Sequence, residues 1–345
     1  MLGARGAGEM ASGKRASRSA RAAQAYNGAV REQLSDLQRA RIVSATFDVV
    51  AQRGAGNVTV AHVVERSGVS RRTFYENFED REDCLLASFE RALTLASQRV
   101  LPAYESGKGW RERIRAGLVA FLAFCDEQPS VAGMLVCESQ ASGPRVAQRR
   151  TEILARLTRI VDQGRKEGKA TNISPLATEG TIGGVLAVIQ ARLAEAKRKP
   201  LVALTNELMN MIVLPYMGAG AARRELDRSL PAPVNARRGE DALISDPFKD
   251  AGMRLTYRTV RVLMATAEHP GASNRLIADT AEITDQGQIS KLLGRLKRAG
   301  MLTNTGLGAG KGAPNAWTLT EDGERIAQSI RSNTEGSQSH GARER

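Results

Sequence analysis

Apolar residues recur at three- and four-residue spacing from residue 42 to residue 53. Ile42, Ala45 and Val49 fall on one stripe of a helix with this period, and Val50 extends the stripe. Gly54 follows, and a residue without Cβ tolerates the left-handed turn that a helix exit needs. The pattern predicts an amphipathic helix that ends at this glycine.

A shorter apolar pattern follows. Thr59 can cap a short helix with three valines on its inner face, Val60, Val63 and Val64. Residues 67–70 (SGVS) predict a tight turn, in which the glycine and a buried Val69 let two helices cross closely. The next short helix, residues 71–78, has a basic face. Two short helices joined by a four-residue turn predict a helix-turn-helix, a structure that places its second helix in a DNA major groove.

Residues 42–85 resemble the DNA-binding domain of the tetracycline-repressor (TetR) family of bacterial transcriptional regulators. The resemblance rests on residues at the family's spacing: Arg53-Gly54, Val58-Thr59-Val60, Ser67-Gly68-Val69-Ser70, Thr73-Phe74-Tyr75, Phe78 and Arg81-Glu82-Asp83-Cys84-Leu85. Four places depart from the usual residues but keep their chemical roles: Ala55, Val63-Val64, Asn77 and Arg81. The resemblance implies a mainly helical homodimer that binds a pseudo-palindromic operator and releases it when a small-molecule effector binds.

The residues expected to contact DNA lie in and around the second short helix. They are Thr59, Ser70, Arg71, Arg72, Thr73, Tyr75, Glu76, Asn77 and Arg81. Arginine suits guanine, so Arg71 and Arg72 are candidate base readers. The resemblance implies phosphate contacts for Thr59, Tyr75, Asn77 and Arg81. Helix capping by Thr59 and core packing by part of Tyr75 are alternative roles.

Residues 86–230 predict an all-helical ligand-binding and dimerisation domain. The expected helices are the continuation of the helix opened at Asp80, residues 110–127, 130–139, 145–167, 175–197 and 201–217. The last two are apolar over several turns and so belong in a core or against a partner subunit. The resemblance implies a homodimer through helices within 175–217. Four apolar residues are candidates for an effector pocket or for plain core: Trp110, Phe121, Phe124 and Met134.

Residues 247–332 predict a second DNA-binding fold, with helices over 253–268, 274–278 and 286–299, a β-hairpin and a last helix. This segment resembles the winged helix of MarR-type regulators in residues 296–302 (LKRAGML) and 319–323 (LTEDG). Its tentative DNA contacts are Gln286, Gln288, Ser290, Lys291, Arg295 and Lys311. The wing, residues 305–314, has Lys311 as its one cation, whereas MarR wings have an Asp/Arg-rich tip. Docking of a protein partner is therefore the alternative role.

The fold class is mainly α, with a small β-hairpin near the C-terminus. A basic arm is expected at 1–33, the TetR-type domain at 34–85, a linker at 231–246 and a tail at 333–345. The arm is either a solvated tail or a flexible segment that binds phosphates. A net charge of +13 and a pI near 10.1 favour an anionic partner. Aromatic residues make up 4% of the chain, which suits helix bundles.

Other chemistry finds little support in the sequence. Residues 308–313 match a dinucleotide fingerprint, but Pro314 and a strand follow instead of a helix. The three histidines lack ligand spacing, and His62 is expected to be solvated. The three cysteines are expected to be buried, with oxidant sensing as an alternative. We therefore expect no enzyme activity, cofactor, metal or membrane span, and a cytoplasmic protein.

These observations favour a sequence-specific transcriptional regulator, most simply a repressor controlled by an unknown effector. The alternative is an adaptor whose winged helix docks a protein while the TetR-like segment alone binds DNA.

Overall fold

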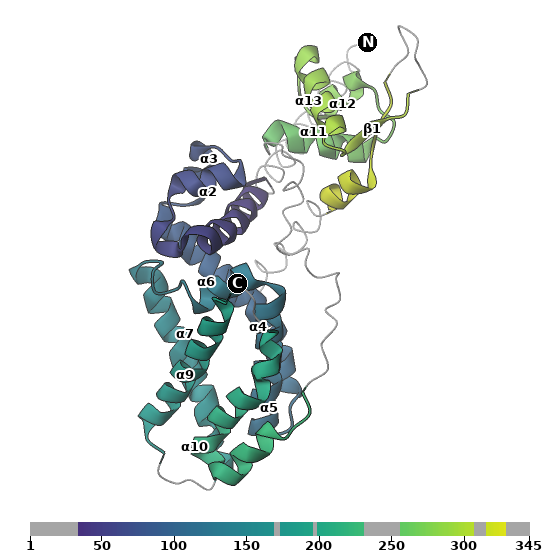
Figure 1. The fold of residues 1–345 in the computed structure, drawn as a ribbon. Helices are drawn as coiled ribbons and strands as arrows, with labels where there is room; N and C mark the ends of the chain where they lie inside the picture. Colours follow the sequence, from purple (N-terminus) through teal and green to yellow (C-terminus); the bar gives the residue numbers. More distant parts are fainter. Residues whose placement is uncertain (1–33, 169–172, 196–198, 231–255, 307–314, 329–345) are drawn as a thin grey trace, which may run out of the picture. The chain divides into compact units, whose positions relative to one another are not determined.

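The computed structural model describes residues 34–168, 173–195, 199–230, 256–306 and 315–328 (Figure 1). From these ranges, the larger of two compact units takes residues within 42–67 and 74–241. The smaller unit takes residues within 1–41, 68–73 and 242–345. The expected arm, linker and tail, and Lys311 of the wing, lie outside the described residues.

The helix-turn-helix forms as the sequence predicts. A helix over residues 34–53 precedes η1 (Ala55–Asn57), α2 (Val60–Ser67) and α3 (Arg71–Asn77). Gly54 and Gly68, in the two turns, have φ of 72° and 67°, which an L side chain rarely adopts. Val63 is buried at 2% exposure, whereas Val69 is half-buried and not fully buried as expected.

The rest of the larger unit is helical. Its elements are α4 (Arg81–Ser106), α5 (Trp110–Glu127), α6 (Pro129–Val136), α7 (Pro144–Asp162), α8 (Gly164–Glu167), α9 (Pro175–Leu193), η2 (Leu201–Leu204) and α10 (Thr205–Leu226). α4 packs along α5, and α9 packs against α7 and α10. Asp80 caps α4, because its carboxylate accepts a hydrogen bond from the Asp83 amide at 2.8 Å.

Several expected boundaries were wrong, among them the helix expected over 130–139, which ends at Val136. The helix expected over 145–167 is broken at Gln163 into α7 and α8, and α9 ends at Leu193. The last helix, expected to end at Met217, continues to Leu226, still within the helical domain expected over 86–230. A kink at Gly218 (φ 77°, ψ 174°) turns the chain, so that the final turns of α10 pack back on the unit.

A buried ion pair holds this final part of α10. Arg115 of α5 donates one hydrogen bond to Glu225 at 2.8 Å and one to Asn206 at 2.5 Å. Glu225 is fully buried and Arg115 is 7% exposed. Asn206 in turn donates to the Arg228 carbonyl at 2.6 Å. The cluster joins α5 to both ends of α10 and explains why the helix extends beyond its apolar pattern.

The smaller unit contains α11 (Tyr257–Glu268), α12 (Asn274–Thr280) and α13 (Gln286–Arg298), followed by β1 (Leu302–Asn304) and β2 (Trp317–Leu319). The strands pair antiparallel, with Leu302 opposite Leu319, and a helix begins at residue 321. Ser273 and Asp285 cap α12 and α13, because their side-chain oxygens accept hydrogen bonds from the Leu276 and Gly287 amides. Residues 253–255 of the first expected helix lie outside the described residues.

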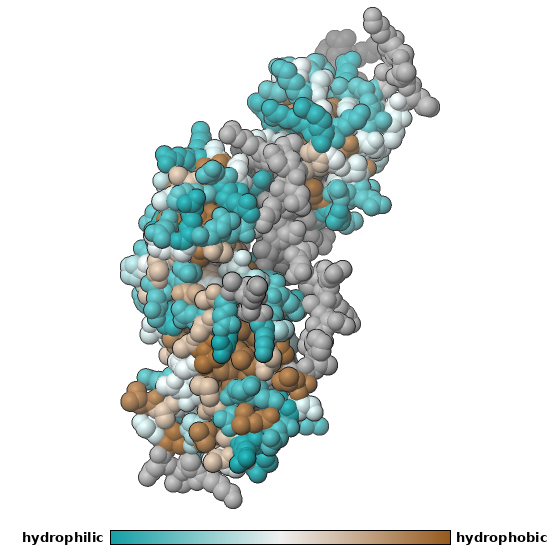
Figure 2. Space-filling model, in the orientation of Figure 1, coloured by the Kyte–Doolittle hydropathy of each residue, from teal (hydrophilic) through white to brown (hydrophobic). Residues whose placement is uncertain are grey.

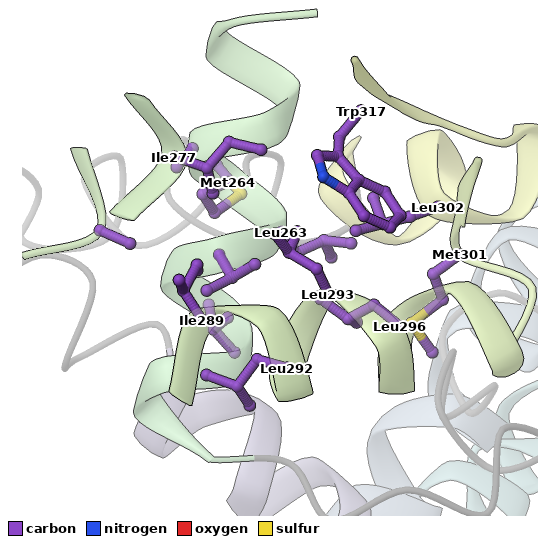
Figure 3. Packing of buried hydrophobic residues seen from close by; sticks show 14 of the residues in the cluster. Leu263, Met264, Ile277, Ile289, Leu292, Leu293, Leu296, Met301, Leu302 and Trp317 are labelled. Atoms are coloured by element: carbon purple, nitrogen blue, oxygen red, sulfur yellow. The ribbon is translucent and has the colours of Figure 1, made fainter. Parts of the chain in front are cut away.

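Apolar side chains from all three helices and both strands fill one core in this unit. Figure 3 shows Leu263 of α11, Ile277 of α12 and Leu293 of α13 facing Leu302 and Trp317. Burial of α13 along this side leaves its opposite side exposed.

We expect Glu225→Ala to lower the free energy of unfolding of the larger unit by about 3–5 kcal/mol, because Arg115 would remain buried without its carboxylate. Urea unfolding of the full chain in a Trp317→Phe background measures this, since Trp110 is then the remaining indole. Glu195→Ala is the control, because Glu195 pairs with Arg192 on the surface. That change should cost less than about 0.5 kcal/mol, and equal effects of the two substitutions would contradict the assignment.

Candidate nucleic-acid interface

Helix α3 is fixed by aromatic residues on its inner side. Phe74 is fully buried and Phe78 is 2% exposed, with ring centroids 5.6 Å apart. Burial of these two rings leaves Arg71, Arg72 and Glu76 exposed on the outer side. The helix thus presents two guanidinium groups and a carboxylate to solvent while its inner side is held in place.

Tyr75 belongs to the exposed side. Its side chain is 57% exposed, and its ring meets Phe74 edge-on at a centroid distance of 5.4 Å. Core packing, the alternative role expected for part of Tyr75, is represented by this ring contact with Phe74.

The hydroxyl residues at the helix starts act as caps. The Ser70 hydroxyl accepts from the Thr73 amide at 3.0 Å and lies 2.9 Å from the Thr73 hydroxyl. The Thr59 hydroxyl accepts from the His62 amide at 3.3 Å. Capping by Thr59, the alternative role from the sequence, is therefore present in the structure. Both capping residues are exposed, and Ser70 directly precedes Arg71 and Arg72 of α3.

Arg81 is engaged within the domain. Its guanidinium donates to the carbonyls of Gly56 and Val58 at 3.3 and 3.2 Å. It is half-buried, as is Asn77. Arg81 thus braces the turn between the first two helices, while Asn77 sits at the last position of α3.

The sequence did not indicate the structural role of Arg66. This arginine binds Asp48 through two hydrogen bonds of 2.9 and 2.6 Å and thereby ties α2 to the first helix. The two residues lie 18 positions apart, so no helical spacing relates them.

In the smaller unit, α13 presents the second set of predicted residues. Gln286, Ser290, Lys291 and Arg295 are exposed, and Gln288 is half-buried. Lys297 and Arg298, which were not predicted, are exposed in the last turn of the same helix and add to its positive charge.

Asparagines join this helix to the hairpin. The Asn274 side-chain oxygen accepts from the Trp317 indole at 2.6 Å and from the Asn315 amide at 3.0 Å. Its amide donates to the Ser290 hydroxyl at 3.3 Å. At the start of the hairpin loop, Asn304 accepts from the Ala316 amide at 3.0 Å. The hairpin is therefore held at a fixed place relative to α13, a feature that no sequence pattern indicated.

Comparison with known proteins identifies the N-terminal segment. Residues 42–88 match the family described as "Bacterial regulatory proteins, tetR family". This segment is a TetR-family helix-turn-helix domain. The predicted recognition of this domain is confirmed, and that of the MarR-like winged helix stays a prediction.

A curated relative is the HTH-type transcriptional activator FasR of Mycolicibacterium smegmatis, which is 24% identical over 112 residues. The alignment covers 32% of this chain, and the chain spans about half (51%) of that relative's length. Two similar solved structures are a fatty acid degradation regulator FadR from Bacillus halodurans and a TetR family regulator from Marinobacter aquaeolei VT8. The first is 18% identical and covers 50% of this chain and 96% of its own, with a TM-score of 0.45. The second is 22% identical and covers 52% and 97%, with a TM-score of 0.42.

The histidine and cysteine side chains differ partly from expectation. His62, expected to be solvated, is half-buried, and its Nδ1 has no hydrogen-bond partner among the described residues. Cys84 and Cys125 are buried as expected, whereas Cys137 is half-buried. Burial, together with the neighbouring Glu138 carboxylate, raises the pKa of the Cys137 thiol. This shift opposes formation of the reactive thiolate at neutral pH.

Within the described residues, no group of histidine, cysteine, aspartate and glutamate side chains is arranged to hold a metal ion. In the same residues no single helix has the length and hydropathy of a membrane span, and α5 with α6 meets that test only as a pair bent by 119°.

The neighbouring residues Phe74 and Tyr75 should separate folding from DNA contact. We expect Phe74→Ala to destabilise the TetR-family domain by about 3–5 kcal/mol, because it empties the centre of the core. Tyr75→Ala should change stability by less than about 1 kcal/mol but weaken DNA binding. Hydrogen exchange of the α2 and α3 amides measures the first effect and fluorescence anisotropy with DNA the second. Equal loss of protection in both variants would contradict this division.

Proposed function

We propose that this chain is a sequence-specific transcriptional regulator that acts in the cytoplasm as a homodimer. In its simplest form it represses by occupying a pseudo-palindromic operator and leaves the DNA when a small-molecule effector binds. The observation that supports this proposal is the exposed, basic side of α3 on a TetR-family helix-turn-helix domain.

Arg71 and Arg72 supply sequence reading in this proposal. Each guanidinium can donate two hydrogen bonds to the major-groove edge of guanine, worth about 1–3 kcal/mol per good contact. Tyr75 and the hydroxyls of Thr59 and Ser70 fit phosphate contacts, which fix the position of the helix without reading bases. The net charge of +13 adds a salt-dependent attraction to any DNA.

The dimer interface in this proposal is formed by α9 and α10. These helices pack together. At Gly184 of α9 they approach so closely that an added Cβ would lie 3.3 Å from the Met211 methyl group of α10. Their outer sides are apolar, with Leu176 72% and Leu214 47% exposed. Figure 2 shows apolar residues (brown) reaching the surface of the helical unit. If two copies of the chain packed against each other through these sides, the apolar surface would be removed from water. The dimer would then carry two helix-turn-helix domains.

An effector site within the helical unit is supported by one buried donor. The Trp110 indole N–H is buried and has no acceptor among the described residues, which is uncommon for a buried polar group. A ligand with an acceptor would satisfy it. Of the other three pocket candidates, Phe124 and Met134 are buried in the core and Phe121 is half-buried.

The smaller unit is proposed to be a winged helix and a second DNA reader. Three helices followed by a hairpin fit that fold, and the exposed cations Lys291, Arg295 and Arg298 of α13 fit an anionic partner. The adaptor alternative is favoured by Leu276 of α12, which is 46% exposed and suits a protein contact.

Selection of binding sites from random DNA tests the double-reader proposal. The full chain should select a longer or composite motif than the full-length variant Lys291→Ala/Arg295→Ala, because that variant lacks two α13 contacts. The salt dependence of its affinity should also weaken by about two phosphate equivalents. If the wild-type chain and the variant select identical motifs and have the same salt dependence of affinity, α3 alone reads DNA and the adaptor alternative is favoured. Failure of the wild-type chain to select any motif would refute the regulator proposal itself.

The dimer proposal is tested by sedimentation equilibrium. The wild-type chain should be a dimer, and Leu176→Glu/Leu214→Glu should be a monomer, because four buried charges would face each other across the interface. Leu101→Glu is the matched control, since Leu101 is 53% exposed on α4. A monomeric wild type, or a dimer that the double substitution leaves intact, would contradict the assigned interface.

A further inference from the structure

The turn between α6 and α7, residues 137–143, contacts η1 of the TetR-family domain (the reader, residues 42–88). The Glu138 carboxylate accepts a hydrogen bond from the Ala55 amide at 2.8 Å. Ala55 is fully buried and is the first residue of η1, so its N–H has no acceptor within its own helix. Leaving such a buried donor unpaired costs about 1–3 kcal/mol. Glu138 therefore stabilises the exit from the helix that ends at Arg53.

A second carboxylate, on the reader, accepts a hydrogen bond from the start of α7. Glu82, in the first turn of α4, accepts from the Arg145 amide in the first turn of α7 at 2.8 Å. Gly143 precedes α7 with φ of 112°, and a Cβ there would lie 2.8 Å from the Glu82 carboxylate oxygen. Glycine at this position thus allows the close approach. The Arg145 side chain adds an ion pair with Asp83 at 3.5 Å.

The turn itself is well fixed. The Glu138 carbonyl accepts from the Ser142 hydroxyl at 2.8 Å and from the Ala141 amide at 3.1 Å. The Glu138 amide donates to the Gly133 carbonyl at 3.0 Å, so the residue moves with the end of α6. Met134, one turn earlier, is fully buried in the helical core. A shift of α6 in that core must displace the acceptor of the Ala55 amide.

We propose that Glu138 and Glu82 are positioning residues that hold the TetR-family reader on the helical core. Each carboxylate caps a helix of the other part: Glu138 of the core caps η1, and Glu82 of the reader caps α7. Their hydrogen bonds fix the orientation of α3 and thereby the operator affinity of the dimer. This inference rests on the proposed function, because operator affinity is its consequence.

Operator affinity and hydrogen exchange of full-length variants test this proposal together. Glu138→Ala should weaken affinity for the selected operator by about tenfold or more and speed exchange of the Ala55 amide by a similar factor, as loss of about 1–3 kcal/mol implies. Glu138→Gln keeps an acceptor oxygen and should stay within about threefold of wild type in both readouts. Glu82→Ala should weaken affinity in the same direction and speed exchange at Arg145. Glu127→Ala is the control, because its ion pair with Arg99 joins α4 to α5 away from the reader.

The outcomes separate this inference from the proposed function. A wild-type chain that selects no sequence refutes the proposed function, and exchange at Ala55 still decides whether Glu138 holds its amide. Faster exchange in Glu138→Ala with unchanged operator affinity overturns the positioning role. Unchanged exchange at both amides overturns the two caps. If Glu138→Ala does not fold, the Glu138→Gln and Glu82→Ala results decide in its place.

Discussion

The reader depends on the burial of Phe74 and Phe78. A helix of seven residues has little stability in water, so α3 (Arg71–Asn77) exists because these rings fix one side of it in a core. The same burial determines which residues face solvent. Arg71, Arg72 and Tyr75 are exposed because they occupy the positions of the turn that the rings leave free. The chemistry of the surface thus follows from the packing beneath it.

Carboxylates connect this small domain to the helices that follow. Glu138 and Glu82 each satisfy a backbone amide at the start of a helix in the other part, and Glu90 binds Arg149 across α4 and α7. Such contacts are directional, because a hydrogen bond weakens steeply as its angle departs from linearity. The buried pair of Arg115 and Glu225 fixes the C-terminal end of α10 to α5. The proposed dimer surface on α9 and α10 therefore lies on a well-braced unit.

The sequence predicted what depends on local patterns. Capping by Thr59 and the glycine turns at Gly54 and Gly68 were predicted because each depends on a few neighbouring residues. The contact of Glu138 with Ala55 joins residues 83 positions apart, and that of Arg115 with Glu225 joins residues 110 apart. No spacing rule relates such pairs, and the extension of α10 beyond Met217 was missed for that reason. The basic face of α3 was predicted from its sequence, whereas the bracing role of Arg81 required the fold.

The central claim is that α3 reads DNA sequence, and the affinity of Arg71→Ala/Arg72→Ala for two DNA duplexes tests it most directly. One duplex carries the motif selected by the wild-type chain, and the other has the same length and composition in scrambled order. Loss of guanine contacts should weaken binding to the motif by about 1–3 kcal/mol per arginine beyond the loss on the scrambled duplex. An equal loss on both duplexes, with a parallel change in salt dependence, would show only attraction to phosphates and would contradict the account.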